Sequence, residues 1–104
     1  MYFIYLKKVM DVYKMEENEI AQSLVSISVE CDGVALSYFL VGTAFILPLE
    51  EEPQQGRILV FQVINCRKVN LCHEIETKGC VYTLSQFEKN MIVASINSGV
   101  RTLK

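Results

Sequence analysis

The sequence predicts an all-β protein built from four-stranded antiparallel meanders, amounting to about two blades of a β-propeller. Three observations support this prediction: two short and continuous apolar runs, one strand that alternates apolar with polar residues, and a restart of the pattern after residue 79. Short apolar runs bounded by Gly, Pro and Asn are typical of strands buried on both faces. A unit of four short strands that recurs after a few tens of residues is typical of propeller blades.

The first unit is expected to run from an inner strand to an outer one. "AQSLVSISVE" (21–30) has the small polar residues of an inner strand, and "SYFLVGTAFILP" (37–48) and "GRILVFQVI" (56–64) are the buried middle strands. "KVNLCHEIE" (68–76) alternates as an outer strand does, with one face on a core and one in water. The apolar face comprises Val69, Leu71, His73 and Ile75, and the solvent face comprises Lys68, Asn70, Cys72, Glu74 and Glu76.

A second unit begins after Thr77-Lys78-Gly79. Its strands are predicted at "CVYTLSQF" (80–87), "MIVASIN" (91–97) and "VRTLK" (100–104), where the sequence ends. We therefore expect the chain to be a piece of something larger. Two blades cannot close a ring, so each would present an apolar face without a neighbour, in keeping with the 51% hydrophobic content. We expect the isolated chain to be marginally stable or to aggregate.

Residues 1–18 leave two alternatives open. "YLKKVMDVYKMEEN" (5–18) has good helix formers and mixed charge, so it fits a helix, and it fits equally the outer strand of a preceding blade followed by a connection.

The glycines and one Asn-Ser-Gly sequence predict structural turns and close backbone contacts. Gly42, inside a strand, should allow close packing on a neighbouring blade, and Gly56 and Gly79 should form turns at the starts of strands. Asn97-Ser98-Gly99 should form a tight hairpin turn, with Gly99 free to take a positive φ.

Composition and charge narrow the function classes. The formal net charge is −2, which disfavours direct nucleic-acid binding because that needs clustered Lys and Arg. No apolar run reaches the roughly 18 residues of a membrane span, and the short apolar start lacks a signal peptide's basic region, so we expect an intracellular chain without membrane contact. The cysteines (Cys31, Cys66, Cys72 and Cys80) contain no C-x-x-C pair and fit buried, reduced thiols.

The sequence contains no recognisable set of catalytic or metal-binding residues, so we expect neither an enzyme nor a cofactor. A zinc site from Cys66, Cys72, His73 and Cys80 is conceivable, but adjacent Cys72 and His73 would point to opposite faces of a strand. His73, the single histidine, fits the core or rim better than catalysis, because no second base or nucleophile accompanies it. The strand aromatics are expected in the core: Tyr38, Phe39, Phe45, Phe61, Tyr82 and Phe87.

The main exposed feature is the loop "LEEEPQQG" (49–56). In a propeller meander this connection lies on the same rim as the crossing between blades. The predicted partner-binding rim therefore comprises Glu50, Glu51, Glu52, Gln54, Gln55, Lys78, Glu74 and Glu76. Loops on rigid scaffolds concentrate function, but a solvated loop and a solvated outer strand, whose charges only face water, are the favoured interpretation of these residues. Arg57 and Arg101 could contact a partner or pair with loop carboxylates, and a structural ion pair is the favoured interpretation.

Three stretches carry a resemblance to a known family. "NEIAQSLVS" (18–26), "VGTAFILPLEEEPQQGRILVFQV" (41–63) and "KGCVYTLSQFEKNMIVASINSGVR" (78–101) closely resemble the family of the large damage-specific DNA-binding subunit. The same family includes large subunits of mRNA cleavage-and-polyadenylation and splicing complexes. Residues 1–18 match poorly, so the expected division is an unmatched segment 1–18 and a partial propeller 19–104.

The resemblance implies more than the residues themselves show. Such family members have three seven-bladed propellers, and the matched stretch would come from the third. They serve as adaptors of cullin-4 RING ubiquitin ligases in DNA damage repair, have no catalytic residues, hold substrate receptors between the first and third propellers, and contact DNA only indirectly. The implied location is the nucleus, and also the cytoplasm. Two alternatives remain: an RNA-processing subunit that binds nucleic acid within a complex, and a free-standing small β domain.

Overall fold

A computed structural model describes residues 1–5, 8–64, 68–88, 91–97 and 99–103. Every regular element in these residues is a β-strand, which confirms the all-β prediction. The strands are β1 (Tyr2–Tyr5), β2 (Lys8–Val12), β3 (Glu19–Cys31), β4 (Val34–Phe45), β5 (Gly56–Ile64), β6 (Lys68–Thr77), β7 (Val81–Glu88), β8 (Met91–Ile96) and β9 (Gly99–Leu103). Within the same residues, no helix is long and apolar enough to cross a membrane.

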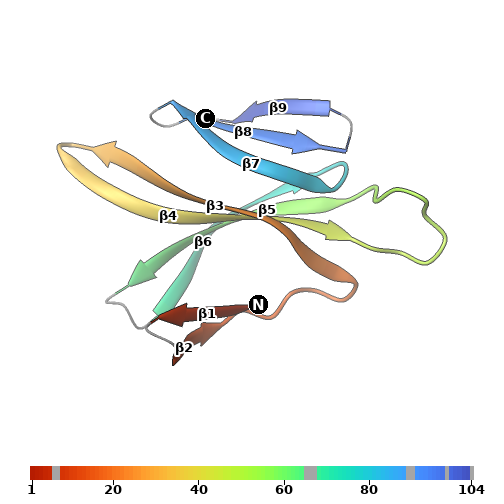
Figure 1. Cartoon of the computed structure of the whole chain (residues 1–104), viewed down its shortest axis with the longest axis horizontal. Helices are drawn as coiled ribbons and strands as arrows, with labels where there is room; N and C mark the ends of the chain where they lie inside the picture. The colour runs from red at the N-terminus through yellow and green to blue at the C-terminus, as the bar shows by residue number, and fades with distance from the viewer. Residues whose placement is uncertain (6–7, 65–67, 89–90, 98, 104) are drawn as a thin grey trace.

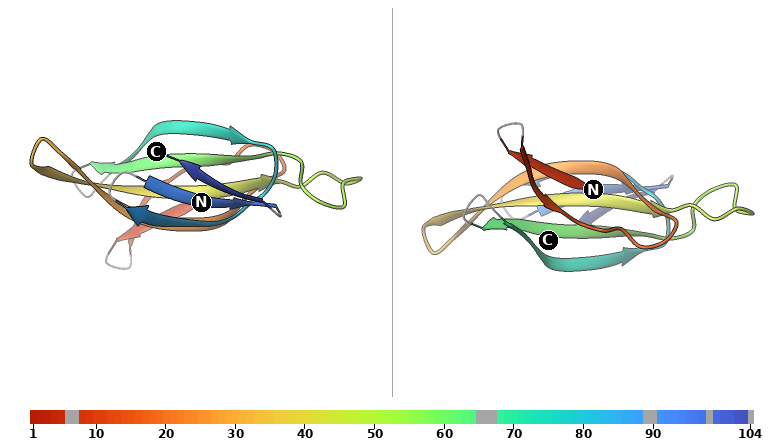
Figure 2. Two further views of the ribbon diagram at one scale, coloured as in Figure 1. Left: turned by 90° about the horizontal axis from the view of Figure 1, so that it is seen from above. Right: turned by 90° about the horizontal axis from the view of Figure 1, so that it is seen from below.

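The strands form three antiparallel sheets, each a meander of sequence neighbours. Their orders are β1-β2, β3-β4-β5-β6 and β7-β8-β9. The four-stranded sheet lies in the middle, with β7–β9 on one side and the β1–β2 hairpin on the other (Figure 1). Seen from above, the blue strands overlie the central sheet, and seen from below the red hairpin does (Figure 2). The predicted complete unit and the start of the next one are both present, as in successive propeller blades.

The middle strands are buried on both faces, as their apolar runs predicted. One face carries Leu40 and Ile58, which pack on Val81 and Ala94 of the β7–β9 sheet, and we call it the β7 face. The opposite face, which we call the hairpin face, carries Val41, Leu59 and Phe61 and packs on Met1, Tyr13 and Met15. The Tyr13 and Phe61 rings form a T-shaped pair with their centroids 5.1 Å apart.

Hydrogen bonds between the sheets reveal the length of the repeat. Asp11 accepts from the Val69 N–H, Ser23 donates to the Val81 carbonyl and Gln86 donates to the Ser28 carbonyl, each pair being 58 residues apart. A constant separation means that equivalent positions in successive units lie beside one another. The repetition, which is weak in the sequence, is therefore clear in the contacts between the units.

Glycines lie where backbones approach most closely. A Cβ on Gly42 would be 2.5 Å from Val81 Cγ1 in the next sheet and 2.3 Å from Ser23 Oγ. A Cβ on Gly56, the first residue of β5, would be 2.5 Å from the carbonyl oxygen of Gly79. No larger side chain fits between these backbones without movement. Of the last predicted turn, Asn97 has a φ of 50° and Gly99 begins β9, while Ser98 lies outside the described residues.

A β-bulge in β6 overturns the prediction of a single apolar face on this strand. Val60 lies opposite His73 but Phe61 lies opposite Leu71, so Cys72 is an extra residue. One extra residue reverses the faces of everything beyond it. Val69 and Leu71 therefore pack on the hairpin face, whereas His73 and Ile75 belong to the β7 face and are exposed. The prediction of a packed His73 was wrong for this reason.

Other expectations also need correction. Residues 1–18 hold the β1–β2 hairpin, so the helix alternative was wrong. Tyr82 and Phe87 are 42% and 68% exposed, so they are not core residues. Phe61 is buried as predicted, and Tyr38, Phe39 and Phe45 are half-buried. The strands β3 and β4 extend beyond their predicted ends to a turn at Asp32-Gly33, where φ is 51° and 77°.

Candidate functional site

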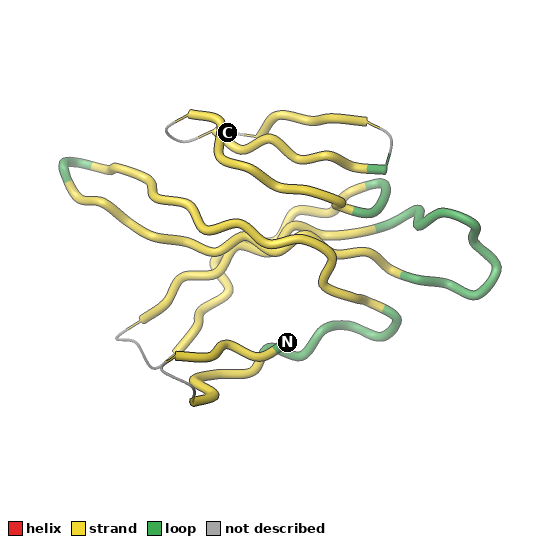
Figure 3. Tube along the Cα trace, in the orientation of Figure 1, coloured by secondary structure: helices red, strands yellow, loops and turns green. Residues whose placement is uncertain are grey.

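A hollow lies at the rim, where the long β4–β5 loop meets the end of β6. This loop projects from one end of the sheet (Figure 3). The hollow, which we call the rim depression, has a volume of about 480 Å³. It is lined by Glu16, Phe45, Gln54, Gln55, Gly56, Arg57, Glu74, Glu76, Thr77 and Lys78. The structure thus brings together five of the eight predicted rim residues, from the loop, from β6 and, in Lys78, from the residue that follows β6.

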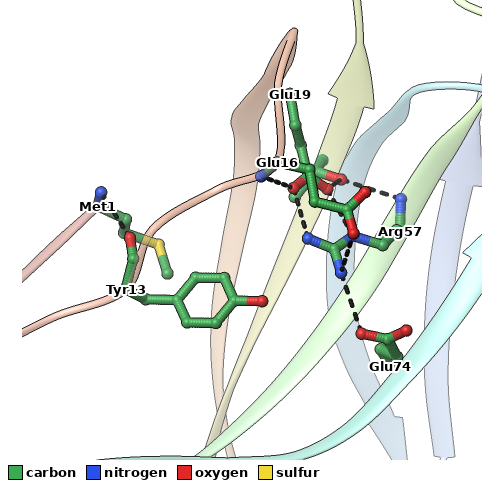
Figure 4. Close-up of polar contacts among 7 residues, drawn as sticks. Met1, Tyr13, Glu16, Glu19, Arg57 and Glu74 are labelled. Atoms are coloured by element: carbon green, nitrogen blue, oxygen red, sulfur yellow. Dashed lines mark hydrogen bonds and ion pairs between the residues drawn. The ribbon is translucent and has the colours of Figure 1, made fainter.

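Arg57 forms the inner wall of the rim depression and is held by a buried network. Its Nε donates to Glu19 Oε2 at 2.7 Å, its Nη2 donates to Glu19 Oε1, and its Nη1 donates to Glu74 Oε2 at 3.0 Å (Figure 4). Glu16 Oε1 lies 3.8 Å from Nη1. The favoured structural ion pair of Arg57 is therefore present, but its partners come from β3, β6 and residue 16 rather than from the loop.

Thr43 and the chain before β3 complete the network. The Thr43 hydroxyl donates to Glu19 Oε2 at 2.7 Å and accepts from the Arg57 backbone N–H at 2.9 Å. The Glu16 backbone N–H donates to Glu19 Oε1 at 3.0 Å. Arg57, Glu19 and Thr43 all lie on the hairpin face, so one carboxylate joins three strands and the preceding segment. Every buried polar side-chain atom among the described residues has a hydrogen-bond partner.

The network shifts the pKa values of its charged groups. Hydrogen bonds from Arg57 to Glu19 raise the pKa of the guanidinium further above its usual value, against the opposing effect of burial. Burial alone would raise the pKa of Glu19, but hydrogen bonds from Arg57, Thr43 and the Glu16 N–H outweigh it and lower the pKa. Both groups are therefore charged at neutral pH, as a buried pair must be to remain stable.

The exposed part of the rim depression is acidic. Glu16 and Glu74 side chains are 63% and 51% exposed, and Glu76 is exposed beside them. Lys78 is the opposing exposed cation in the lining, because the charge of Arg57 is already offset by Glu19. The amides of Gln54 and Gln55 add donors and acceptors, and Phe45 adds an apolar surface. This arrangement suits a cationic side chain with an apolar stem.

Three predicted rim residues, Glu50, Glu51 and Glu52, do not line the depression. They occupy the outer part of the loop, which Asn97 ties to the next sheet. The Asn97 side chain donates to the Pro53 carbonyl at 3.0 Å and accepts from the Cys80 N–H at 2.7 Å. The loop is therefore fixed against the following unit rather than free. Its role in partner binding stays a prediction.

The remaining predicted chemistry can be placed only in part. Cys80 is buried and Cys72 is half-buried, and both are free thiols. Cys66 and the side chains of Cys31 and Arg101 lie outside the described residues. No group of three or more His, Cys, Asp and Glu side chains in the described part of the chain could hold a metal ion. Burial, followed by the charge of Glu52, raises the pKa of the Cys80 thiol.

Glu19 and Thr43 are the site residues that sequence reasoning missed. One feature of the sequence could have pointed to Glu19. Arg57 lies near the start of a strand predicted to be buried, and a buried cation needs a buried anion. Pairing of adjacent antiparallel strands then points to the start of the inner strand. Glu19 lies opposite Phe45, and Thr43 and Phe45 point to the same face as Arg57.

Comparison with known proteins gives a consistent assignment. The family model described as "CPSF A subunit region" matches residues 4–104. DNA damage-binding protein 1 of Oryza sativa subsp. japonica is 40% identical over 95 residues, which cover 91% of this chain and 8% of that protein. DNA damage-binding protein 1a of Arabidopsis thaliana is 39% identical over 95 residues, and DNA damage-binding protein 1 of Solanum lycopersicum is 38% identical over 92 residues. They cover 91% and 88% of this chain, respectively, and 8% of each relative.

These matches confirm the resemblance in the three sequence stretches. The family match also begins at residue 4, within the segment 1–18 that we expected to lie outside it. The chain spans about 8% of the length of the curated relatives that it matches. It belongs to the family of the CPSF A subunit region, together with DNA damage-binding protein 1.

Proposed function

We propose that this chain forms part of a protein-binding scaffold and that the rim depression receives a basic segment of a partner. The observation that carries the proposal is the rim itself, where three exposed carboxylates, two amides and Phe45 line one depression while the buried Arg57 is neutralised by Glu19. Such a surface favours a protein segment rich in Arg or Lys and repels a phosphate backbone.

The relatives give the scaffold a context. Their name, DNA damage-binding protein 1, and the family resemblance support a role as an adaptor of a cullin-4 RING ubiquitin ligase in DNA damage repair and protein ubiquitination. In this role the partners are substrate receptors and the remaining blades of the same propeller, and DNA is reached only through those receptors. The chain itself performs no chemistry, and it works in the nucleus.

The test uses the native protein that carries this sequence, tagged and purified from cells, with Glu76→Lys as the variant. Glu76 lines the rim depression and lies opposite Arg57 in the β5–β6 register, but the ion partners of Arg57 are Glu16, Glu19 and Glu74, so the reversal changes the surface charge without removing a partner of the network. Glu88→Lys, on an exposed part of β7, is the matched control. Quantitative mass spectrometry then compares the proteins recovered with each variant.

The expected result is a several-fold loss of substrate receptors with Glu76→Lys, no loss with Glu88→Lys, and unchanged recovery of cullin-4, which binds elsewhere in the adaptor. Equal recovery of receptors with both variants would refute the rim depression as the binding surface. Absence of cullin-4 from every preparation would refute the ligase context.

An RNA-processing role is the second candidate, because the family model takes its description from the CPSF A subunit. Ultraviolet crosslinking of the native protein to RNA, with recovery of crosslinked peptides from residues 46–78, would favour it over the scaffold of a ligase. The acidic rim argues against such crosslinks.

A further inference from the structure

Asn97, in the turn after β8, joins two segments of the chain that both contribute to the lining of the rim depression. Its Nδ2 donates to the Pro53 carbonyl at 3.0 Å, and its Oδ1 accepts from the Cys80 N–H at 2.7 Å. The Asn97 backbone N–H also donates to the Cys80 carbonyl at 2.9 Å. One end of the amide therefore holds the β4–β5 loop, and the other end holds the crossing between β6 and β7.

The contacts of Asn97 lie directly beside residues of the lining. Pro53 precedes the two glutamines of the lining, so the hydrogen bond to its carbonyl orients the peptide group that leads into them. In the crossing, a Cβ on Gly79 would be 2.4 Å from Asn97 Nδ2, so the amide packs against this stretch of backbone. The Gly79 carbonyl accepts in turn from the hydroxyl of Thr77, a lining residue, at 2.8 Å. Both walls of the depression are thus held through one side chain.

Asparagine suits this position for two separate reasons. Its φ of 50° lies in the left-handed region, which Asn adopts more readily than most residues other than Gly. Its side chain offers both a donor and an acceptor, and both are used, on partners from different segments. The turn alone does not require the donor, since Gly or Asp would also tolerate the positive φ. The donor therefore serves the β4–β5 loop.

We infer that Asn97 is a positioning residue for the rim depression, so that a side chain of the following unit sets the shape of this unit's partner-binding surface. The inference rests on the proposed function of the depression. Asn97 is not among the residues that line the depression, so it acts through the path of the loop and not through contact with a partner. Without its donor the loop must be ordered when the partner binds, and that ordering weakens binding.

The test uses Asn97→Asp in the native protein that carries this sequence. Aspartate keeps the acceptor for the Cys80 N–H, but it places an oxygen instead of the donor opposite the Pro53 carbonyl. Asn18→Asp is the matched control, because Asn18 is exposed and also has a positive φ, of 64°. Hydrogen exchange of peptides spanning residues 45–57 reports on the loop, and quantitative mass spectrometry of the recovered proteins reports on partner binding.

Asn97→Asp should speed exchange in residues 45–57 several-fold and lower the recovery of substrate receptors several-fold, whereas Asn18→Asp should change neither. Exchange in residues 81–96 should stay unchanged, which separates loss of the loop contact from general loss of stability. The added negative charge would by itself attract a basic partner more strongly, so a loss of receptors reports on position and not on charge. Asn97→Gly, which keeps the positive φ and removes the whole side chain, should have the same effect on the loop and on the receptors.

Two results would overturn the inference. One is loop exchange in Asn97→Asp that matches the exchange in Asn18→Asp, and the other is faster loop exchange with unchanged recovery of receptors. If Glu76→Lys lowers the recovery of receptors while Asn97→Asp does not, the inference alone fails and the proposed function stands. If neither variant lowers it, both fail.

Discussion

The buried ion pair between Glu19 and Arg57 gives a sharp test of how the rim is held in place. The side chains are 0% and 6% exposed. Glu19→Ala would leave Nε and Nη2 of Arg57 and the Thr43 hydroxyl without their acceptor. Removing one partner of a buried pair costs about 3–5 kcal/mol, because the remaining charge stays desolvated. The isolated chain is expected to be only marginally stable, below the roughly 5–15 kcal/mol of a typical domain, so without an osmolyte the variant should lose most of its folded population.

The assay is urea unfolding followed by far-ultraviolet circular dichroism at neutral pH. Trimethylamine N-oxide at one fixed concentration raises the stability of all variants, so that a folded baseline is available. The variants form a double-mutant cycle of Glu19→Ala, Arg57→Ala and the double variant, and the exposed Glu17→Ala is the control. The double variant should cost about 2 kcal/mol less than the two single costs combined, because it leaves no unpaired buried charge.

One outcome would refute this reasoning. If Glu19→Ala costs less than about 1 kcal/mol, the pair behaves like an exposed salt bridge and does not hold the rim. The control should change the free energy of unfolding by no more than about 0.5 kcal/mol, as surface substitutions usually do.

Three further predictions concern pH, packing and thiol reactivity. The Arg57 and Thr43 hydrogen bonds hold the pKa of Glu19 below its ordinary 4.5 in spite of burial. The ionised Glu19 carboxylate therefore stabilises the fold fully above pH 4.5, and this stabilisation is lost as the pH falls through the lower pKa of the folded state. Urea unfolding from about pH 5 to about pH 3 should show this loss in the unchanged chain and less of it in Glu19→Ala. Gly42→Ala should cost about 1–3 kcal/mol in urea unfolding, because the methyl group would overlap Val81, and an unchanged midpoint would contradict the close sheet contact. Iodoacetamide should alkylate Cys72 before Cys80 in the native chain, because burial raises the pKa of the Cys80 thiol, and equal rates by peptide mass spectrometry would count against this.

The existence and order of the strands could be predicted from the sequence, because a strand buried on both faces has a continuous apolar run. The runs that became β4 and β5 contain almost only apolar residues, and the restart after Gly79 marks the next unit. The prediction failed for the faces of β6, where the sequence pattern does not show the bulge. The extra residue Cys72 breaks the alternation of β6 in space but not in sequence, so four residues that looked like one face became two.

Local turn chemistry could have improved the prediction. Asp32-Gly33 between alternating residues is a strong hairpin signal, and it would have extended β3 and β4 to their observed ends. The rim could be predicted in part, since Gln54, Gln55 and Lys78 come together through topology alone. The position of Glu50 could not, because the loop's path depends on the Asn97 contact with Pro53, which joins distant segments.

The central claim is that this chain is a set of propeller blades whose open faces are covered by further blades of one larger protein. The most direct measurement is the size of the native protein that carries the sequence. The tryptic peptide "ILVFQVINCR" (58–67) can be followed by mass spectrometry across a size-separated cell extract. We expect the peptide only in species far larger than 11.9 kDa. A stable species near 11.9 kDa would contradict the claim, and the scaffold function would lose its basis.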